Sequence, residues 1–368
     1  MNHSRSRKAF TLVEILVVIV ILGIMGAMVT TAVSGVTSTA KQSRTKNIIA
    51  IVDSVLAEHH ENLKYRPLPV EIPLMWKELD KRDASSDTGT LGYEVLLREA
   101  SRIRLMMARD LQRMELPDRY TDILQGPTDL YAAATLLKKV DGKIKAMRSD
   151  KSQRLAFRVE FSGTSKQYVY QRRIGDKTAH PEFRTHQGAE CLYLIMASSF
   201  VGGAPALDAI PTANIGDTDE DGMPEILDGW GKPLRFVRWP IGYLYDKEAL
   251  IDKSKPEDHD MFLCDYAYDN PGLEKPWSIK PLVFSCGSDG ESGLITDPDD
   301  NSLFSYQANW SWPIAKCGPE EKEGRNEPYW FPDPYLRGSS RSILPGARRP
   351  GDTTTVDDIT NYQLQVSP

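Results

Sequence analysis

The longest feature in the pattern of apolar and polar residues is an apolar run close to the N-terminus. It covers residues 10–33, and no charged residue occurs between Ile15 and Ala40. As a helix, this run would be about 36 Å long, which is enough to cross a hydrocarbon core of about 30 Å. The pattern therefore predicts a membrane-spanning helix over residues 10–33.

Beyond this run, apolar residues recur at the spacing of one helix face. They are Ile48, Val52, Val55, Leu56 and Leu63. Pro67 and Pro69 follow, and proline ends a helix because it lacks the backbone N–H group. We therefore expect one helix over residues 10–64, with an apolar first half and an amphipathic second half.

Shorter periodic segments indicate both helices and strands in the rest of the chain. Helical spacing predicts further helices over residues 93–115, 130–137 and 187–200. Apolar, β-branched and aromatic residues predict strands at residues 155–161, 168–170, 234–236 and 281–285. The expected fold class is therefore α+β.

Two basic clusters raise the question of nucleic-acid binding. One is an arginine face on the helix at 93–115, made of Arg98, Arg102, Arg109 and Arg113. The other follows it, made of Lys138, Lys139, Lys143, Lys145 and Arg148. Acidic residues are interleaved with the arginines, aromatic residues are not, and the net charge of the chain is −6. We therefore expect solvated helix faces and no nucleic-acid partner.

A single acidic side chain, Glu14, interrupts the apolar run. A carboxylate inside a membrane helix costs about 2.5–3.5 kcal/mol. The residues three and four positions later are Val17 and Val18, so the helix itself offers no cation there. The helix dipole favours an anion near the N-terminus, but complete compensation requires a positive charge from elsewhere.

The segment from Lys8 to Glu14, KAFTLVE, lies between a short basic leader and the apolar run, and it resembles the type IV prepilin signal. The resemblance implies that a prepilin peptidase cleaves between Ala9 and Phe10 and methylates the new amino group. It also implies that Glu14 pairs with the N-terminal amine of a neighbouring subunit. Ala9 departs from the glycine that is usual in this family, although small residues occur there in pseudopilins.

Two other interpretations of the N-terminus stay open. A secretory signal peptide would have a basic start and an apolar core, with small residues for cleavage near Ala32 and Ser34. An ordinary signal anchor would have the same apolar core without cleavage. Both leave Glu14 unexplained.

The resemblance also implies a pilin-like fold, in which the long N-terminal helix packs on a globular domain with a small antiparallel sheet. The chain then divides into a leader (1–9), the helix (10–64), a mostly helical insertion (65–190), a pseudopilin-like region (191–316) and an irregular tail (317–368). The implied location is the inner membrane, crossed once, with the globular domain outside the cytoplasm. The implied partners are identical or different pilin-like subunits, prepilin peptidase, the inner-membrane assembly machinery and membrane lipid.

An acidic loop before residue 230 has the spacing of a calcium loop. Asp217, Asp219 and Asp221 alternate ahead of Gly222, which allows a sharp turn. The predicted oxygen donors are Asp217, Asp219, Asp221, the carbonyl of Met223, Glu225 and Asp228, at positions 1, 3, 5, 7, 9 and 12. Carboxylates at this density repel one another without a cation, so Ca²⁺ is the expected cofactor. An acidic surface turn is the alternative.

The prediction of a second metal-binding loop is based on a resemblance. Residues 228–236, DGWGKPLRF, resemble the DPWG-type element of the major pseudopilins of type II secretion. The strand at 281–285 and the glycine-rich segment after it resemble the calcium-binding loop of those proteins. The implied ligands are Asp289, Asp297, Asp299 and Asp300. A glycine-rich turn without metal is the alternative.

The four cysteines are Cys191, Cys264, Cys286 and Cys317, and they contain no CxxC pair. A zinc knuckle is therefore not expected, and three disulfide pairings stay open. The sequence contains no GxSxG, HExxH or P-loop motif, so no enzyme is expected.

The predicted function is structural: a pilin-like or pseudopilin subunit of a type II secretion or type IV pilus-like filament. The alternative is a membrane-anchored binding module for DNA, protein or glycan that uses the prepilin route. An anchored enzyme is the third possibility. The acidic cluster could serve a metal hydrolase, but the sequence around it lacks companion histidines. The sequence does not decide between the two filament systems.

Overall fold

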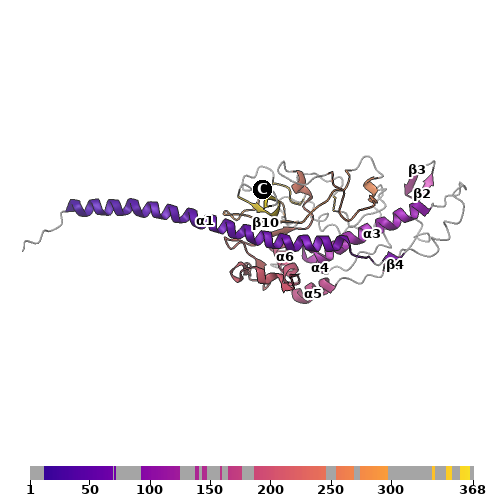
Figure 1. Ribbon diagram of the computed structural model, residues 1–368, viewed down its shortest axis with the longest axis horizontal. Helices are drawn as coiled ribbons and strands as arrows, with labels where there is room; N and C mark the ends of the chain where they lie inside the picture. Colours follow the sequence, from indigo (N-terminus) through magenta and orange to yellow (C-terminus); the bar gives the residue numbers. More distant parts are fainter. Residues whose placement is uncertain are drawn as a thin grey trace, which may run out of the picture.

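The computed structural model describes residues 12–68, 70–71, 93–124, 137–140, 143–146, 158–159, 165–175, 186–245, 254–268, 274–296, 334–335, 345–349 and 357–364. Its dominant element is the helix α1 (Leu12–Lys64), which contains 53 residues. One half of α1 lies along a globular head, and the other half projects from it (Figure 1). The single helix predicted for residues 10–64 is thus confirmed from Leu12 onward.

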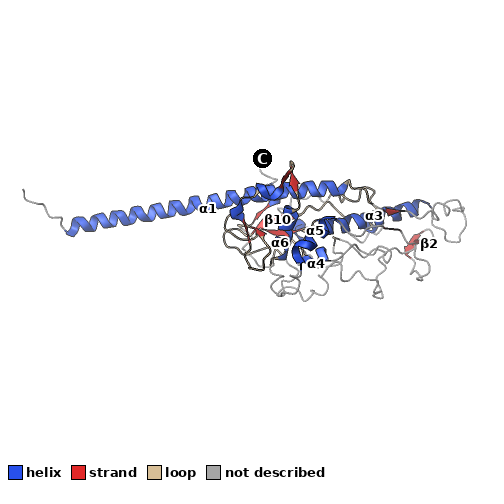
Figure 2. Cartoon of the chain, turned by 90° about the horizontal axis from the view of Figure 1, so that it is seen from below, coloured by secondary structure: helices blue, strands red, loops and turns tan. Residues whose placement is uncertain are grey.

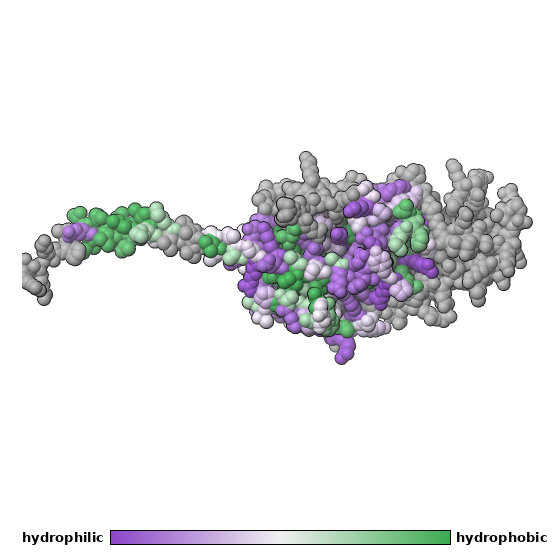
Figure 3. Space-filling model, in the orientation of Figure 1, coloured by the Kyte–Doolittle hydropathy of each residue, from purple (hydrophilic) through white to green (hydrophobic). Residues whose placement is uncertain are grey.

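The projecting half of α1 is apolar on all sides. From Leu12 to Met28, the large apolar side chains are 48–82% exposed. Figure 3 shows this half as a green, hydrophobic rod beside a head of mixed polarity. Within the part of the chain that the structure describes, no helix has an apolar stretch long enough to cross a membrane. The membrane-spanning segment at residues 10–33 stays a prediction.

The other half of α1 forms part of the hydrophobic core, as its amphipathic pattern predicted. Its predicted apolar face is buried, with Ile48, Val52, Val55, Leu56 and Leu63 at most 4% exposed. These side chains belong to one hydrophobic cluster with residues of the other helices and the sheet, among them Leu111, Met114, Leu192, Ile195, Phe236 and Val283. The helix ends at Lys64, where the Arg66 N–H donates to the Leu63 carbonyl just before Pro67.

A small antiparallel sheet packs on this half of α1. It consists of β9 (Arg235–Val237), β10 (Leu282–Ser285) and β11 (Ile359–Thr360), with β10 in the middle. Val283 pairs with Phe236, and Phe284 pairs with Thr360. The short helix α8 (Asn361–Leu364) follows β11 and lies against α1. The predicted strands at 234–236 and 281–285 are therefore confirmed.

The remaining described helices lie on one side of α1, as Figure 2 shows. They are α3 (Tyr93–Glu115), α4 (Tyr120–Leu124), α5 (Ser165–Ile174) and α6 (Gln187–Ala197). The helix predicted at 93–115 is confirmed, and the one predicted at 187–200 ends at Ala197. Pro117 lies just beyond α3, in keeping with the inability of proline to continue a helix.

The other strands form two-stranded antiparallel pairs. These are β1 (Val70–Glu71) with β4 (Arg158–Val159), β2 (Leu137–Val140) with β3 (Lys143–Ala146), β5 (Phe200–Val201) with β6 (Ala204–Pro205), and β7 (Ile215–Gly216) with β8 (Glu225–Ile226). The connections include the 3₁₀ turns η4 (Ala206–Ala209), η5 (Thr212–Asn214), η6 (Ile241–Tyr245) and η7 (Tyr266–Tyr268). The molecule is thus α+β with small antiparallel sheets.

One predicted element is wrong in the region between α3 and α6, and another lies almost entirely outside the described residues. Residues 168–170, expected as a strand, lie in α5, where Gln167, Tyr170 and Ile174 form one buried helix face. The helix predicted at 130–137 meets β2 at Leu137, and its other residues lie outside the described ones. The second basic cluster lies on the β2–β3 hairpin, apart from Arg148, which is also outside the described residues.

The solvated face predicted for α3 is wrong for three of its four arginines, and the side chain of Arg98 lies outside the described part. Arg102, Arg109 and Arg113 are each at most 5% exposed. Their charges have partners within the head: Arg109 Nη2 lies 2.7 Å from Asp265 Oδ2, and Arg113 Nε lies 2.7 Å from Asp110 Oδ1. Arg109 also pairs with Glu257 through its Nε, which donates to Oε1 over 2.9 Å. Residues distant in sequence bury this face, so helical periodicity alone could not reveal it.

Parts of the predicted irregular tail are also folded. Besides β11 and α8, the tail contributes Tyr335, which is buried against Trp277 with ring centroids 5.0 Å apart. Cys191, Cys264 and Cys286 are buried free thiols, and Cys317 lies outside the described residues.

Candidate functional site

The acidic loop that the sequence singles out is the tip of a β-hairpin. Residues 217–224 connect β7 to β8, and Ile215 pairs with Ile226 at the base. Gly222 has φ +87°, the conformation expected of the glycine at position 6. Its N–H donates to Asp217 Oδ2 over 2.8 Å, and the Met223 N–H donates to Asp221 Oδ1 over 2.6 Å. The predicted sharp turn is therefore present.

The first turn of α6 faces this hairpin. His186 precedes the helix, and its carbonyl accepts the N–H groups of Ala189 and Glu190 over 2.8 and 3.0 Å. Gly188 allows this turn to lie close to β9, because an added Cβ would be 3.3 Å from the Phe236 carbonyl oxygen. His186 and Glu190, at the start of α6, both lie close to carboxylates of the loop.

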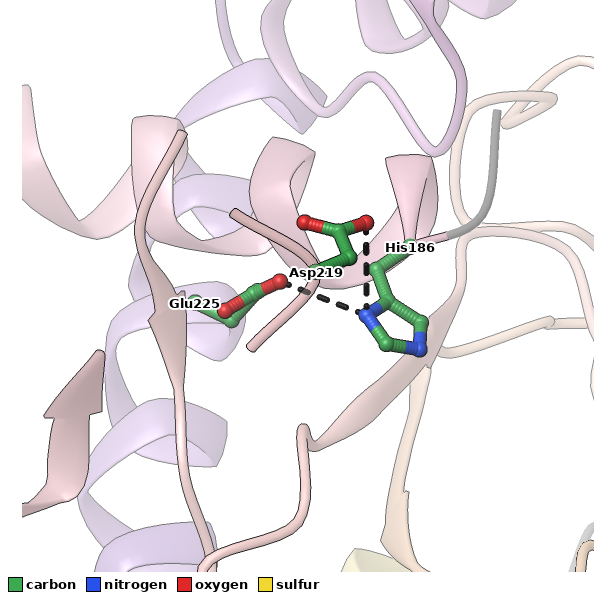
Figure 4. A group of neighbouring side chains, drawn as sticks. All are labelled: His186, Asp219 and Glu225. Atoms are coloured by element: carbon green, nitrogen blue, oxygen red, sulfur yellow. Dashed lines mark hydrogen bonds and ion pairs between the residues drawn. The ribbon is translucent and has the colours of Figure 1, made fainter. Parts of the chain in front are cut away.

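Five side chains converge in two groups that share Asp219. In the first, His186 Nδ1 lies 3.3 Å from Glu225 Oε1 and 3.6 Å from Asp219 Oδ2, as drawn in Figure 4. The second contains Glu190, Asp219 and Asp221. Within each group, one possible ligand atom per residue lies within 4.8 Å of the others. Glu225 is held further by the Thr218 N–H, which donates to Oε2 over 2.9 Å.

Several oxygens of this cluster are buried without a hydrogen bond. Glu190 is fully buried, and the Tyr120 hydroxyl donates to its Oε2, but its Oε1 accepts no hydrogen bond from the described residues. The same holds for both carboxylate oxygens of Asp219 and for Asp221 Oδ2. Burying such atoms without a partner is costly.

The electrostatics agree with this geometry. Burial, together with the nearby carboxylates of Asp221 and Asp219, raises the pKa of Glu190 to about 9. Burial and the carboxylates of Asp221 and Glu225 also raise the pKa of Asp219. Without a cation, Glu190 therefore keeps a proton at neutral pH. Carboxylate oxygens are the ligands that hard divalent cations prefer, so the cluster can hold such an ion.

Asp228, predicted as the twelfth position of the loop, is not part of the cluster. It is buried, and its Oδ1 accepts the N–H groups of Trp230 and Lys232 over 2.8 and 2.9 Å. Its Oδ2 accepts the Ser285 hydroxyl over 2.6 Å. These bonds fix the turn of the DGWG segment and connect it to β10, so the structure places Asp228 in neither of the two groups.

The next residue, Gly229, brings the DGWG segment against α1. Its N–H donates to Thr45 Oγ1 over 2.9 Å, and an added Cβ would lie 2.2 Å from the Lys41 carbonyl oxygen. Only glycine allows the two backbones to approach this closely. The segment therefore docks the head on α1 at the point where the helix leaves it.

The second acidic loop is a glycine turn in its described part. Gly287 and Gly290 have φ of +65° and +74°. Asp289 Oδ1 accepts the Glu291 N–H over 2.9 Å, and Asp357 Oδ2 accepts the Ser288 N–H over 2.7 Å. Asp297, Asp299 and Asp300 lie outside the described residues, so calcium binding at this loop stays a prediction.

Sequence reasoning found part of the converging set. It named Asp219, Asp221 and Glu225, and it missed His186 and Glu190, whose spacing of four residues at the start of a helix was the available signal. The structure does not bring Asp217 or Asp228 into either group. The role of the Met223 carbonyl stays a prediction.

The N-terminal motif lies at the far end of α1 from this cluster. Glu14 is in the first turn of α1, while Ala9 and Phe10 precede the described residues. Residues 4–30 match the family model of the prokaryotic N-terminal methylation motif. They are a prepilin-type signal. A search of curated proteins and of solved structures found no match to the chain.

The prepilin-type signal supports a type IV pilin-like or pseudopilin-like precursor route. It implies processing by prepilin peptidase and assembly with pilin-like subunits in association with a membrane. The match ends at residue 30, so the resemblance of residues 191–316 to pseudopilins is not confirmed.

Proposed function

We propose that this protein is a structural, pilin-like subunit that α1 anchors in the inner membrane and then builds into a filament. The observation that carries this proposal is the projecting half of α1. It bears the prepilin-type signal at residues 4–30, and its apolar side chains from Leu12 to Met28 are exposed all round. A helix that is apolar on every side is stable only when lipid or other helices surround it.

The projecting half occupies two environments in turn, first the membrane and then the filament. Before assembly, lipid surrounds it, and the single-pass location predicted for residues 10–33 applies. After assembly, the same surface packs against the α1 helices of neighbouring subunits. The system is a type II secretion or type IV pilus-like filament.

Glu14 has a specific part in this assembly. Cleavage before Phe10 creates a positively charged amine four residues before Glu14, which lies in the first turn of α1. Each charge is costly in an apolar environment, so pairing the Glu14 carboxylate of one subunit with the amine of the next stabilises the packed state. This pairing also fixes the axial register between subunits.

Mass spectrometry of the protein from the membrane fraction of cells with an active prepilin peptidase tests the precursor route. We expect an N-terminus at Phe10 that carries one added methyl group. Ala9→Leu should leave the leader attached, because the peptidase requires a small residue before the cut in this family.

The matched control is Ala32→Leu, which changes the other small residue where a secretory signal peptide could be cut. We expect this variant to be processed at Phe10 like the wild type. A wild-type N-terminus near Ser34 that disappears in Ala32→Leu would contradict the proposal and favour a signal peptide.

A further inference from the structure

We propose that a divalent cation, Ca²⁺, binds between the first turn of α6 and the β7–β8 loop. Its ligands are four carboxylates, those of Glu190, Asp219, Asp221 and Glu225. The donor set differs from the one that the loop spacing indicates, because it takes Glu190 from a helix about thirty residues earlier and leaves Asp217 and Asp228 out. It does not depend on the proposed filament role.

The first support is the buried oxygen of Glu190. This side chain is fully buried and belongs to the group with Asp219 and Asp221, and its Oε1 accepts no hydrogen bond from the described residues. A solvated acidic turn would leave its oxygens in water. An oxygen that is shielded from water and has no donor is satisfied by a cation instead.

The second support is the geometry of the two groups. Within each group the candidate ligand atoms lie within 4.8 Å of one another. Two oxygens that bind one Ca²⁺ at about 2.3–2.6 Å can be at most about 5.2 Å apart. Asp219 belongs to both groups, and both of its oxygens are buried and accept no hydrogen bond within the described part of the chain, so its carboxylate can join the groups around one ion.

The kind of donor identifies the cation. The set consists of carboxylate oxygens, which suit a hard cation with a high and flexible coordination number, as Ca²⁺ has. Zn²⁺ prefers histidine and cysteine nitrogen and sulfur in a tetrahedral arrangement. His186 is the one ring in the described cluster, and Cys191, the neighbour of Glu190, packs in the hydrophobic core.

His186 has a positioning role in this arrangement. Its Nδ1 lies 3.1 Å from the Thr218 hydroxyl and 3.3 Å from Glu225 Oε1. The ring therefore holds the Glu225 carboxylate in place from the side of α6. Because α6 packs against β8 and β9, a bound ion would fix the loop to the centre of the head.

Thermal unfolding of the full chain in detergent micelles tests the proposal, with circular dichroism as the readout. The protein is first stripped with a chelator and then supplied with Ca²⁺, Mg²⁺ or Zn²⁺ separately. A ligand that binds only the folded state raises Tm, and we expect a rise of about 5 °C in millimolar Ca²⁺. The response to Mg²⁺ should be smaller, because Mg²⁺ demands a stricter octahedral geometry.

Glu190→Gln is the decisive variant. Glutamine has the size and shape of glutamate and keeps a side-chain oxygen that can accept the Tyr120 hydroxyl, so the variant should keep a Tm close to wild type in chelator. Calorimetric titration should show that its Ca²⁺ affinity falls at least about tenfold, as the loss of a charged ligand implies. Asp219→Asn should have the same effect.

Asp217→Asn is the matched control, because Asp217 belongs to the same loop but to neither group. Asparagine keeps one side-chain oxygen that can accept the Gly222 N–H. The Ca²⁺ affinity of this variant should therefore stay near wild type. A Ca²⁺-independent Tm, or a response to Zn²⁺ without one to Ca²⁺, would overturn the proposal. So would full Ca²⁺ affinity in Glu190→Gln, or an Asp217→Asn defect as large as that of Asp219→Asn.

Discussion

The two halves of α1 belong to one continuous helix, yet only one of them is buried by the head of the same chain. From Ile48 to Leu63, apolar residues occupy one face, and the head of the same chain buries them. From Leu12 to Met28, apolar residues occupy every face, and these side chains are exposed. Figure 1 shows the difference directly, since only one half touches the head.

This difference shows how the distribution of apolar residues determines where a helix finds its partners. A stripe on one face can be buried by a single neighbouring domain. A helix that is apolar all round needs neighbours on all sides, which one head attached to one end of the helix does not provide. We therefore propose that the partners of the projecting half are lipid or other subunits.

The comparison predicts that the same substitution has a large effect on stability in one half and almost none in the other. Leu56→Ala removes a side chain that is 1% exposed and should lower the free energy of unfolding by about 2–5 kcal/mol. Leu16→Ala, in the projecting half, should change it by less than about 0.5 kcal/mol. Chemical denaturation of the detergent-solubilised full chain measures both. Equal losses in the two variants would show that the projecting half also contributes to the core of the head.

A smaller effect is expected at the boundary between the halves. Gly229→Ala places a Cβ 2.2 Å from the Lys41 carbonyl oxygen of α1, so the DGWG turn or the helix must shift. We expect a loss of about 1–3 kcal/mol in the free energy of unfolding, as for other overpacked sites. The same denaturation experiment measures it.

The control is Gly35→Ala, on the part of α1 that lies beyond this contact. No atom lies within 4 Å of an added Cβ there. Alanine is the better helix former by about 1 kcal/mol, so this variant should be as stable as the wild type or more so. If Gly229→Ala were as well tolerated as Gly35→Ala, the DGWG segment would not be the point at which the head docks.

The sequence was sufficient for elements that periodicity and proline define. The extent of α1 and α3, the helix α6 and the strands β9 and β10 followed from apolar spacing, with Pro67 and Pro117 close to two helix ends. The turn at Gly222 also followed from the spacing of its neighbours. These features depend on residues close together in the chain.

The errors concern contacts between distant segments. The arginine face of α3 was expected in water, but Glu257 and Asp265 bury and neutralise Arg109. Glu190 and His186 were missed because α6 and the acidic loop come together only in the folded head. Asp228 fitted a calcium spacing, yet its oxygens accept bonds from its own turn and from Ser285. Local spacing does not show which segment covers a side chain.

The central claim is that the projecting half of α1 is an interface between subunits. The most direct test is whether a Glu14→Gln variant assembles. Glu58→Gln is the matched control, because it makes the same change at an exposed position on the half that lies along the head. Both proteins are quantified in the membrane fraction and in the sheared filament fraction of cells with the complete assembly system. We predict normal membrane levels for both, with filaments lost only in Glu14→Gln. Filaments that form normally with glutamine at position 14 would contradict the account.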